Sequence, residues 1–293
     1  MLGSALRSAA SAAGAQVLQL VRRPPASPAE IEWQPAAPQP LPAAERLENI
    51  SAAIHLSGAN LAARRWTPAF RSELLASRVG STRALALTLA ALRHPPQVLL
   101  AASAIGFYGN RGEEILTETS ASGSGFMADL CRQWEAAAQP AVEAGIRVVH
   151  MRLGIVLGPG GALSRMLPVF RLGLGGPLGS GRQWMSWISL PDAVAAMLFA
   201  LQTPALDGPV NLTAPEPVTN AVFTRALARA LHRPAVLPAP AFALRLALGE
   251  MADEALLAST RVLPARLASE GFVFRHPVLD RALAVALAPH ALS

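Results

Sequence analysis

The chain has 293 residues, of which 52% are hydrophobic and 15% are charged, and its formal net charge is +6 at pH 7. This is the composition of a globular protein, and it argues against a membrane protein because no apolar run reaches the ~18 residues that a spanning helix needs. The arginines are scattered and form no basic run, which argues against a nucleic-acid partner.

Taken in chain order, the sequence predicts alternating helices and strands. The expected elements are a helix at 2–13, strands at 16–21, 31–33 and 52–56, a helix at 68–93, a strand at 98–102, a helix at 125–144, strands at 148–153 and 184–188, and helices at 192–201 and 277–288. Strands that alternate with long helices predict βαβ units and a parallel sheet, the Rossmann-type doubly wound α/β fold.

The regular alternation ends near residue 160, where Gly- and Pro-rich turns begin. We therefore expect a nucleotide-binding domain over residues 1–160 and a smaller C-terminal lobe over 161–293 that carries substrate contacts. Asp192 is expected to cap the helix at 192–201.

The start of the fold is unusual. A Rossmann unit opens with a strand and a Gly-rich turn, and the helix that follows holds a pyrophosphate at its amino end. Here the first expected element is already that helix, and Gly3 matches the last glycine of the turn, which allows close packing of helix and strand. The absent strand belongs in the middle of the sheet, where its loss leaves two neighbours unpaired. We expect Met1 to be an internal methionine, with the natural start about ten residues upstream; a genuinely shortened protein is the alternative.

The first 29 residues lack any acidic residue, as organellar transit peptides do. The helix and strand pattern favours a part of the fold instead, and we expect a cytoplasmic protein.

Several chemistries are excluded by residue type. All 25 basic residues are arginines, so lysine Schiff bases, P-loop lysines and lysine general bases are absent. Cys131 is the only cysteine and lies in a helical pattern, which predicts a buried structural thiol and no disulfide. No histidine has metal-ligand spacing to another, so no metal is predicted.

A family resemblance becomes specific when four segments are taken together. In this order they resemble the epimerase family of atypical, extended short-chain dehydrogenases/reductases, including its C-terminal extension: residues 55–60 (HLSGAN), 66–78, 170–183 and 261–274. The resemblance covers nearly the whole chain. It implies that the cofactor is NADP and that five residues contact it: Leu56, Ser57, Glu73, Arg78 and Val156. The alternative for Glu73 and Arg78 is a surface pair on one helix.

The residues themselves also favour NADP(H). An acid about 20 residues after the Gly turn would bind a ribose hydroxyl and select NAD. Here the residue 19 positions after Gly3 is Arg22, with Arg23 beside it. Arginine accommodates a 2′-phosphate through forked, charge-assisted hydrogen bonds. We expect Gly3, Val21, Arg22 and Gly58 to bind the cofactor; two solvated arginines at a strand end are the alternative.

The usual catalytic pair of this family is missing. Short-chain dehydrogenases/reductases use a Tyr-x-x-x-Lys dyad, in which lysine lowers the tyrosine pKa. At the matching positions this chain has Phe126 and Leu130, which neither transfer a proton nor hold a charge. Ser103 matches the family's substrate-binding serine, and Tyr108 is the only phenol, so both are candidate catalytic residues. Otherwise Tyr108 lines the pocket with an aromatic face.

The Gly-rich segment 173–183 has two readings. It is expected to form a loop over the substrate, with Arg182, Gln183 and Trp184 as contacts, or else a structural turn into the next strand.

Two functions follow. One is an NADP(H)-dependent oxidoreductase or epimerase that acts on a small polar or carbonyl compound without the usual dyad. The other is a non-catalytic dinucleotide-binding protein, either a redox sensor or an interaction module. An inactive truncated product is a third possibility if the chain really begins at Met1.

Overall fold

A computed structural model describes residues 1–35 and 44–288. At its centre lie four parallel strands in the order β10-β6-β4-β3. They are β3 (Ala52–His55), β4 (Val98–Ala104), β6 (Arg147–Leu153) and β10 (Gly208–Leu212). Strand β4 is buried along nearly its whole length, as expected for a parallel sheet that is covered on both faces. The predicted α/β fold with a parallel sheet is confirmed.

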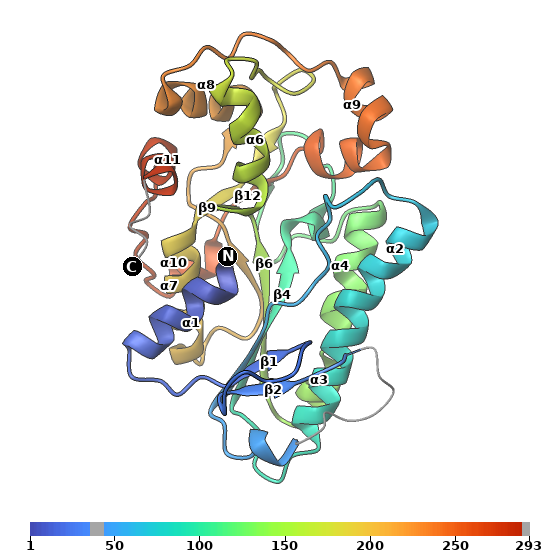
Figure 1. Cartoon of the computed structure of the whole chain (residues 1–293), viewed down its shortest axis with the longest axis vertical. Coiled ribbons are helices and arrows are strands. Elements are labelled where there is room, and N and C mark those ends of the chain that lie inside the picture. The colour runs from blue at the N-terminus through green and yellow to red at the C-terminus, as the bar shows by residue number, and fades with distance from the viewer. Residues whose placement is uncertain (36–43, 289–293) are drawn as a thin grey trace.

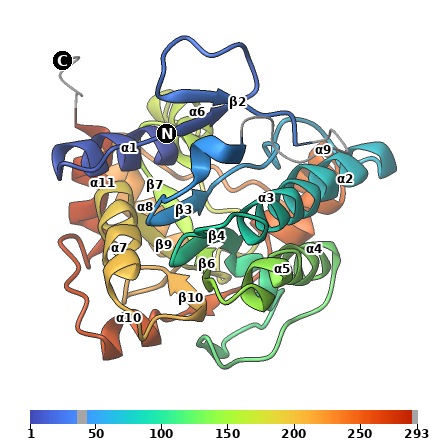
Figure 2. The ribbon, with the colours of Figure 1, turned by 90° about the horizontal axis from the view of Figure 1, so that it is seen from below.

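Helices cover both faces of this sheet (Figure 2). Helices α1 (Leu2–Ala12) and α7 (Leu190–Gln202) lie on one face, where Leu100, Val149 and Val210 form the core. Helices α3 (Ser81–Ala90), α4 (Phe126–Ala136) and α5 (Gln139–Glu143) lie on the other. The side chains beneath them alternate with the first set along each strand, because successive strand residues point to opposite faces.

The predicted helix at 68–93 consists of three joined pieces. Helix α2 (Pro68–Leu75) begins at Thr67, whose Oγ1 accepts a hydrogen bond from the N–H of Phe70 at 3.2 Å. A π-helical turn, Ala76–Gly80, then leads directly into α3.

The first two strands of the chain are not part of the central sheet. Strands β1 (Gln19–Val21) and β2 (Glu30–Glu32) pair in parallel with each other and form a separate sheet. Within the described residues, no strand pairs with the second edge of β1 or with the second edge of β3. Helix α1 contacts both sheets. Arg7 donates to the Gln19 side chain of β1 at 3.0 Å, and Gly3 lies next to Leu56, just after β3 of the central sheet.

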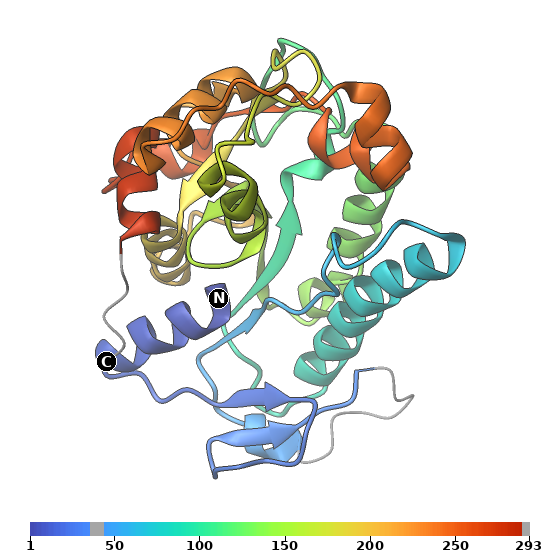
Figure 3. The ribbon, with the colours of Figure 1, turned by 45° about the horizontal axis from the view of Figure 1, so that its top comes forward.

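The C-terminal lobe lies at one end of the sheet (Figures 1 and 3). It has a core of its own around Trp187, Phe223 and Leu283. Its helices are α6 (Gly161–Arg171), α8 (Asn220–Leu231), α9 (Ala241–Leu248) and α11 (Leu279–Leu287), whereas α10 (Ala265–Ser269) packs beside β10 in the core of the main sheet. Three short strand pairs complete the lobe: β7 (Ile155–Leu157) with β9 (Trp187–Ser189), β8 (Trp184–Met185) with β11 (Val218–Thr219), and β5 (Ile115–Leu116) with β12 (Arg261–Val262).

The main sheet draws on both sides of the expected boundary at residue 160, because β10 and α7 return to it. Helix α7 also begins earlier than predicted, and its cap is Ser189. The expectation for Asp192 was wrong: its buried carboxylate accepts hydrogen bonds from the N–H groups of Arg275 and His276, both at 2.9 Å, and so holds the C-terminal segment. No helix of the described part of the chain is long and apolar enough to cross a membrane.

Candidate functional site

The amino end of α1 is exposed and lies beside the end of β3. The first N–H groups of a helix have no acceptor within it, which makes this end a potential anion site. A Cβ atom on Gly3 would meet only Leu56 Cδ1, at 3.9 Å, which is an ordinary van der Waals contact. The predicted reason for glycine here was therefore wrong, because helix and strand leave room for a side chain.

Two neighbouring arginines at the end of β1 differ in their partners. Arg23 donates to both carboxylate oxygens of Glu30, at 2.8 and 2.7 Å, and this hydrogen bonding lowers the pKa of Glu30. Arg22 follows the buried Val21 and is exposed; its guanidinium makes no hydrogen bond or ion pair with any described residue. Only Arg22 is thus available for an external anion.

The loop after β3 is held from beneath by Arg78. This arginine is 7% exposed, donates from Nη2 to the Ala59 carbonyl at 2.9 Å, and lies over the Trp134 ring at 5.2 Å. A Cβ atom on Gly58 would lie 3.2 Å from its Cζ, so glycine allows the guanidinium to approach. Burial lowers the pKa of Arg78. Ser57 and Gly58 remain exposed above it.

Glu73 is placed differently. It is exposed and forms an ion pair with Arg64, a residue of the loop before α2. The alternative of a surface pair between Glu73 and Arg78 is therefore wrong, and only Arg78 lies beneath the loop of residues 57–60.

A row of polar residues crosses the carboxyl ends of three strands. Ser103 of β4 is the register partner of Arg152 in β6, and Arg152 is the partner of Asn211 in β10. Register partners in a parallel sheet point to the same face. Sheets of this kind bind ligands beyond the carboxyl ends of their strands, so this row lies at the expected place.

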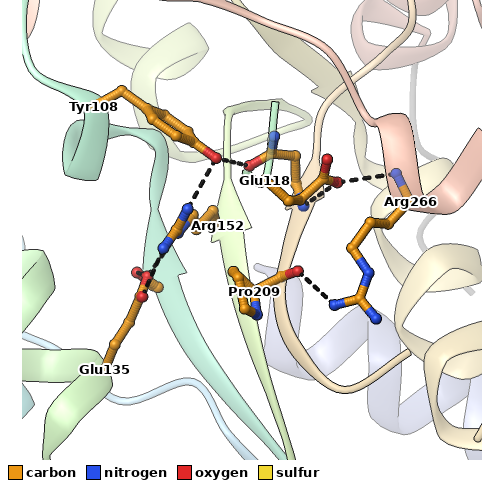
Figure 4. A network of polar contacts seen from close by, with 8 residues as sticks. Tyr108, Glu118, Glu135, Arg152, Pro209 and Arg266 are labelled. Atoms are coloured by element: carbon orange, nitrogen blue, oxygen red, sulfur yellow. Dashed lines mark hydrogen bonds and ion pairs between the residues drawn. The ribbon is translucent and has the colours of Figure 1, made fainter. Parts of the chain in front are cut away.

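Hydrogen bonds join this row to Glu135 of α4 (Figure 4). Arg152 donates from Nε and Nη2 to the two carboxylate oxygens of Glu135, at 2.8 and 2.9 Å, and Ser103 donates to the same carboxylate at 2.7 Å. Arg152 also donates to the hydroxyl of Tyr108 at 3.0 Å, and that hydroxyl donates to Asn211 at 2.7 Å. The network fixes α4 to the sheet.

The two candidate catalytic residues are both inside this network. Tyr108 has no exposed surface and Ser103 is 1% exposed, and both hydroxyls are engaged by protein groups. Burial raises the pKa of Tyr108, although the charge of Arg152 opposes this. Glu135, Arg152 and Asn211 are members of the network that were not predicted from the sequence. An arginine inside the apolar strand 148–153 was the available signal, because a buried charge requires a partner.

Phe126 occupies the position of the family's tyrosine, and its neighbours are an aromatic ring and a guanidinium group. Phe126 opens α4, the edge of Trp66 meets its ring at 5.2 Å between centroids, and the Arg71 guanidinium lies 5.1 Å from the ring centre. Leu130 is buried one turn later, as is Cys131, whose pKa burial raises to about 12. The predicted buried thiol is confirmed.

The contacts of the Gly-rich segment 173–183 favour the interpretation of a structural turn over that of a loop that contacts the substrate. Gln183 is 7% exposed and donates to the carbonyls of Leu178 and Leu256, at 3.1 and 3.2 Å. Trp184 donates to Glu113 at 2.6 Å, whereas Arg182 is exposed. Val156 lies in β7, where it pairs with Ile188.

Comparisons with known proteins identify the family of this chain. Residues 1–212 match the model of the NAD dependent epimerase/dehydratase family, and residues 239–286 match that of a domain of unknown function, DUF1731. An epimerase family protein of Mycobacterium bovis, Mb2239, is 47% identical over 98% of this chain and 94% of its own length. YfhF of Bacillus subtilis, also named an epimerase family protein, is 36% identical over 88% of this chain and 84% of its own.

Solved structures show the same likeness. The human epimerase family protein SDR39U1 (isoform 2), solved with NADPH, has a TM-score of 0.89 and 33% identity, covering 98% of this chain and 95% of that one. A nucleoside-diphosphate sugar epimerase from Corynebacterium glutamicum has a TM-score of 0.79 and 34% identity, covering 98% of this chain and 56% of that one. By the family match and by these identities, the chain belongs to the NAD-dependent epimerase/dehydratase family.

Proposed function

We propose that this protein binds NADP(H), with the pyrophosphate at the amino end of α1 and the 2′-phosphate on Arg22. The observation that carries the proposal is the convergence of three features. The exposed start of α1 lies against Leu56 at the end of β3, and α1 also contacts β1, whose end presents an unpaired arginine. A helix amino end and a free guanidinium are the two groups that phosphates prefer in proteins. The NADPH in the human relative supports the choice of cofactor.

Around this site the chain's own residues have distinct tasks. Arg78 holds the loop of residues 57–60, so that Ser57 and Gly58 present their backbone to the ligand. Glu135 and Arg152 lock α4 to the sheet, and Phe126 forms an apolar wall at the first turn of this helix. We propose Val21 and Val156 as further apolar contacts. Ser103 and Tyr108 act as buried supports for this wall.

We propose an oxidoreductase or epimerase reaction on a small polar or carbonyl compound. When bound, the dinucleotide would supply hydride chemistry at the substrate carbon that changes oxidation state. Phe126 and Leu130 supply no proton, so the proton on the substrate oxygen is exchanged with water or with the substrate's own groups.

A second candidate is a non-catalytic dinucleotide-binding protein. Two observations favour it. Phe126 and Leu130 stand where the family has its Tyr/Lys dyad, and Tyr108, the only tyrosine of the sequence, is buried. Such a protein binds NADPH without turnover.

The two adjacent arginines provide a matched test. Removing a charged hydrogen-bond partner costs about 1.5–3 kcal/mol, so Arg22→Ala should raise the Kd for NADPH ~10–100-fold and leave that for NADH nearly unchanged. Arg23→Ala breaks the contacts of this side chain with Glu30 and with the Pro24 carbonyl, and should leave both affinities within about twofold. Equal effects of the two variants on NADPH would contradict the proposed site. NADPH oxidation across a panel of carbonyl compounds then separates the enzyme from the non-catalytic protein.

A further inference from the structure

One segment of the C-terminal lobe reaches across to the N-terminal lobe. This segment, called the arm here, comprises residues 241–257 and contains α9 and the π-helical turn Ala252–Leu256. Figures 1 and 3 show α9 beside the ends of α2 and α4. Backbone hydrogen bonds anchor both flanks, from Ala239 to Pro177 at 2.9 Å before the arm and from Arg111 to Ser259 at 2.9 Å after it.

The arm holds the N-terminal lobe by two charged contacts. Glu250 forms an ion pair with Arg71 of α2. Glu254 accepts a hydrogen bond from the N–H of Met127, in the first turn of α4, at 3.0 Å. A Cβ atom on Gly125 would lie 2.2 Å from the Glu254 carboxylate, so the approach depends on glycine at that position. Both contacts flank Phe126, the residue at the family's tyrosine position.

Few apolar contacts reinforce these two. No residue of α9 is buried, and Phe242 and Leu246 are 72% and 77% exposed. From the arm, Leu248 and Met251 join the cluster around Trp66 and Phe70. The side chains of Arg71 and Glu250 are each 36% exposed, and ion pairs with that access to water stabilise weakly. A segment with few buried contacts and anchored flanks opens at low cost.

The arm also has an internal tie. Arg245 of α9 and Asp253 of the π-helical turn lie 2.9 Å apart, which joins the two helical pieces to each other. This pair makes no contact with α2 or α4, and it keeps the arm together when the contacts to the other lobe break.

We propose that the arm is a lid over the start of α4, where Phe126 occupies the position of the family's tyrosine. Its closed state is held by Glu250 on Arg71 and by Glu254 on the amino end of α4. Opening breaks these two contacts and the packing of Leu248 and Met251 against the cluster around Trp66 and Phe70, uncovers Phe126 and admits the ligand. The inference rests on the proposed NADP(H) site for its ligand but not for its motion, which is tested without any ligand.

The ligand-free protein gives the first test, by amide hydrogen exchange. Residues 241–257 should exchange at least tenfold faster than β4 and β6 through opening of the arm alone. The double variant Glu250→Gln/Glu254→Gln should speed exchange of the arm a further ~10-fold, since about 1.4 kcal/mol corresponds to tenfold, and leave β4 and β6 unchanged. Exchange of the arm as slow as that of the strands, or unaffected by the variant, would overturn the lid.

A cross-link gives the second test. In a Cys131→Ala background, Arg71→Cys/Glu250→Cys treated with a short bis-maleimide ties the arm to α2, and the association rate of NADPH should fall at least tenfold. The control pair, Arg245→Cys/Asp253→Cys, lies within the arm and should leave this rate unchanged after the same treatment. Equal rates for both pairs would overturn the lid. If the untreated protein takes up no NADPH, the proposed cofactor site fails, and the exchange rates alone decide the lid.

Discussion

Arg152 and Glu135 form a forked ion pair between the central strand β6 and helix α4, with two hydrogen bonds of 2.8 and 2.9 Å. Their side chains are only 4% and 12% exposed, so neither charge can rely on water if the other is removed. Burial would lower the pKa of Arg152, but the hydrogen bond and charge of Glu135 outweigh it and raise that pKa. The pair is therefore a support on which the position of α4 depends.

We expect Glu135→Ala to lower the free energy of unfolding by about 3–5 kcal/mol, because it leaves a buried guanidinium without its charged partner. Asp129→Ala on the same helix is the control: Asp129 forms an exposed pair with Arg132, and its loss should cost less than about 1 kcal/mol. Urea unfolding measures both. Similar losses of unfolding free energy in the two variants would show that the buried pair stabilises the fold no more than the exposed pair does.

Tyr108→Phe tests the role of the only phenol. The hydroxyl connects Arg152 and Asn211, so its removal leaves the Asn211 side-chain oxygen unpaired and should cost about 1–3 kcal/mol of stability. As a buried support, Tyr108 should leave the Kd for NADPH within about twofold. If the variant kept its stability and its affinity for NADPH but lost turnover, Tyr108 would have a chemical role after all.

The sequence predicts the layers of this fold better than its contacts. Apolar strands alternating with long helices are local patterns, and β3, β4, β6 and the helix of residues 68–93 follow from them. The ion pair between Arg152 and Glu135 does not follow from local patterns, because the sequence does not distinguish an exposed from a buried carboxylate on a helix. Asp192 shows the same limit: a residue in a helix's first turn suggests a cap, but its partners, Arg275 and His276, are distant in the chain.

The sequence predicts the candidate cofactor-binding residues as a group, but it does not distinguish their individual roles. Arg22 and Arg23 are equivalent as letters, and only the carboxylate of Glu30, brought alongside by the pairing of β1 with β2, separates them. Likewise, Glu73 and Arg78 lie on one continuous helical stretch, but Glu73 of α2 faces outward to Arg64, whereas Arg78 lies within the π-helical turn and beneath Gly58.

His55 should make the protein sensitive to acid. It is 2% exposed, its Nε2 lies 3.0 Å from the Ser81 hydroxyl, and burial lowers its pKa to about 4 from an ordinary 6.5. Above pH 6.5 the ring is neutral in both folded and unfolded chains, and its contribution is complete. As the pH falls from 6.5 towards 4, only the unfolded chain takes up the proton, so stability is lost, by about 3 kcal/mol in all.

Urea unfolding at several pH values measures this effect. His55→Gln should reduce the loss between pH 6.5 and 4, and His150, whose pKa burial also lowers, should account for a further part of it. His94→Gln, at an exposed histidine beside Glu48, should retain it. An unchanged pH profile for His55→Gln would show that other groups cause the acid sensitivity.

Variants of Arg78 and Glu73 distinguish a residue that positions the loop of residues 57–60 from a residue that contacts the cofactor directly. Arg78→Met removes the donor that holds the Ala59 carbonyl and loosens the loop of residues 57–60, so the Kd for NADPH should rise ~10-fold, the equivalent of about 1.4 kcal/mol. Glu73→Gln removes only an exposed ion pair with Arg64 and should change that Kd less than about twofold. Arg78→Lys should restore part of the affinity, because a lysine can still donate to Ala59, whereas a purely steric role would be filled equally well by methionine. Isothermal calorimetry at matched folded fractions distinguishes these cases. A loss for Glu73→Gln as large as that for Arg78→Met would instead place Glu73 in contact with the cofactor, which requires the loop before α2 to move in the complex.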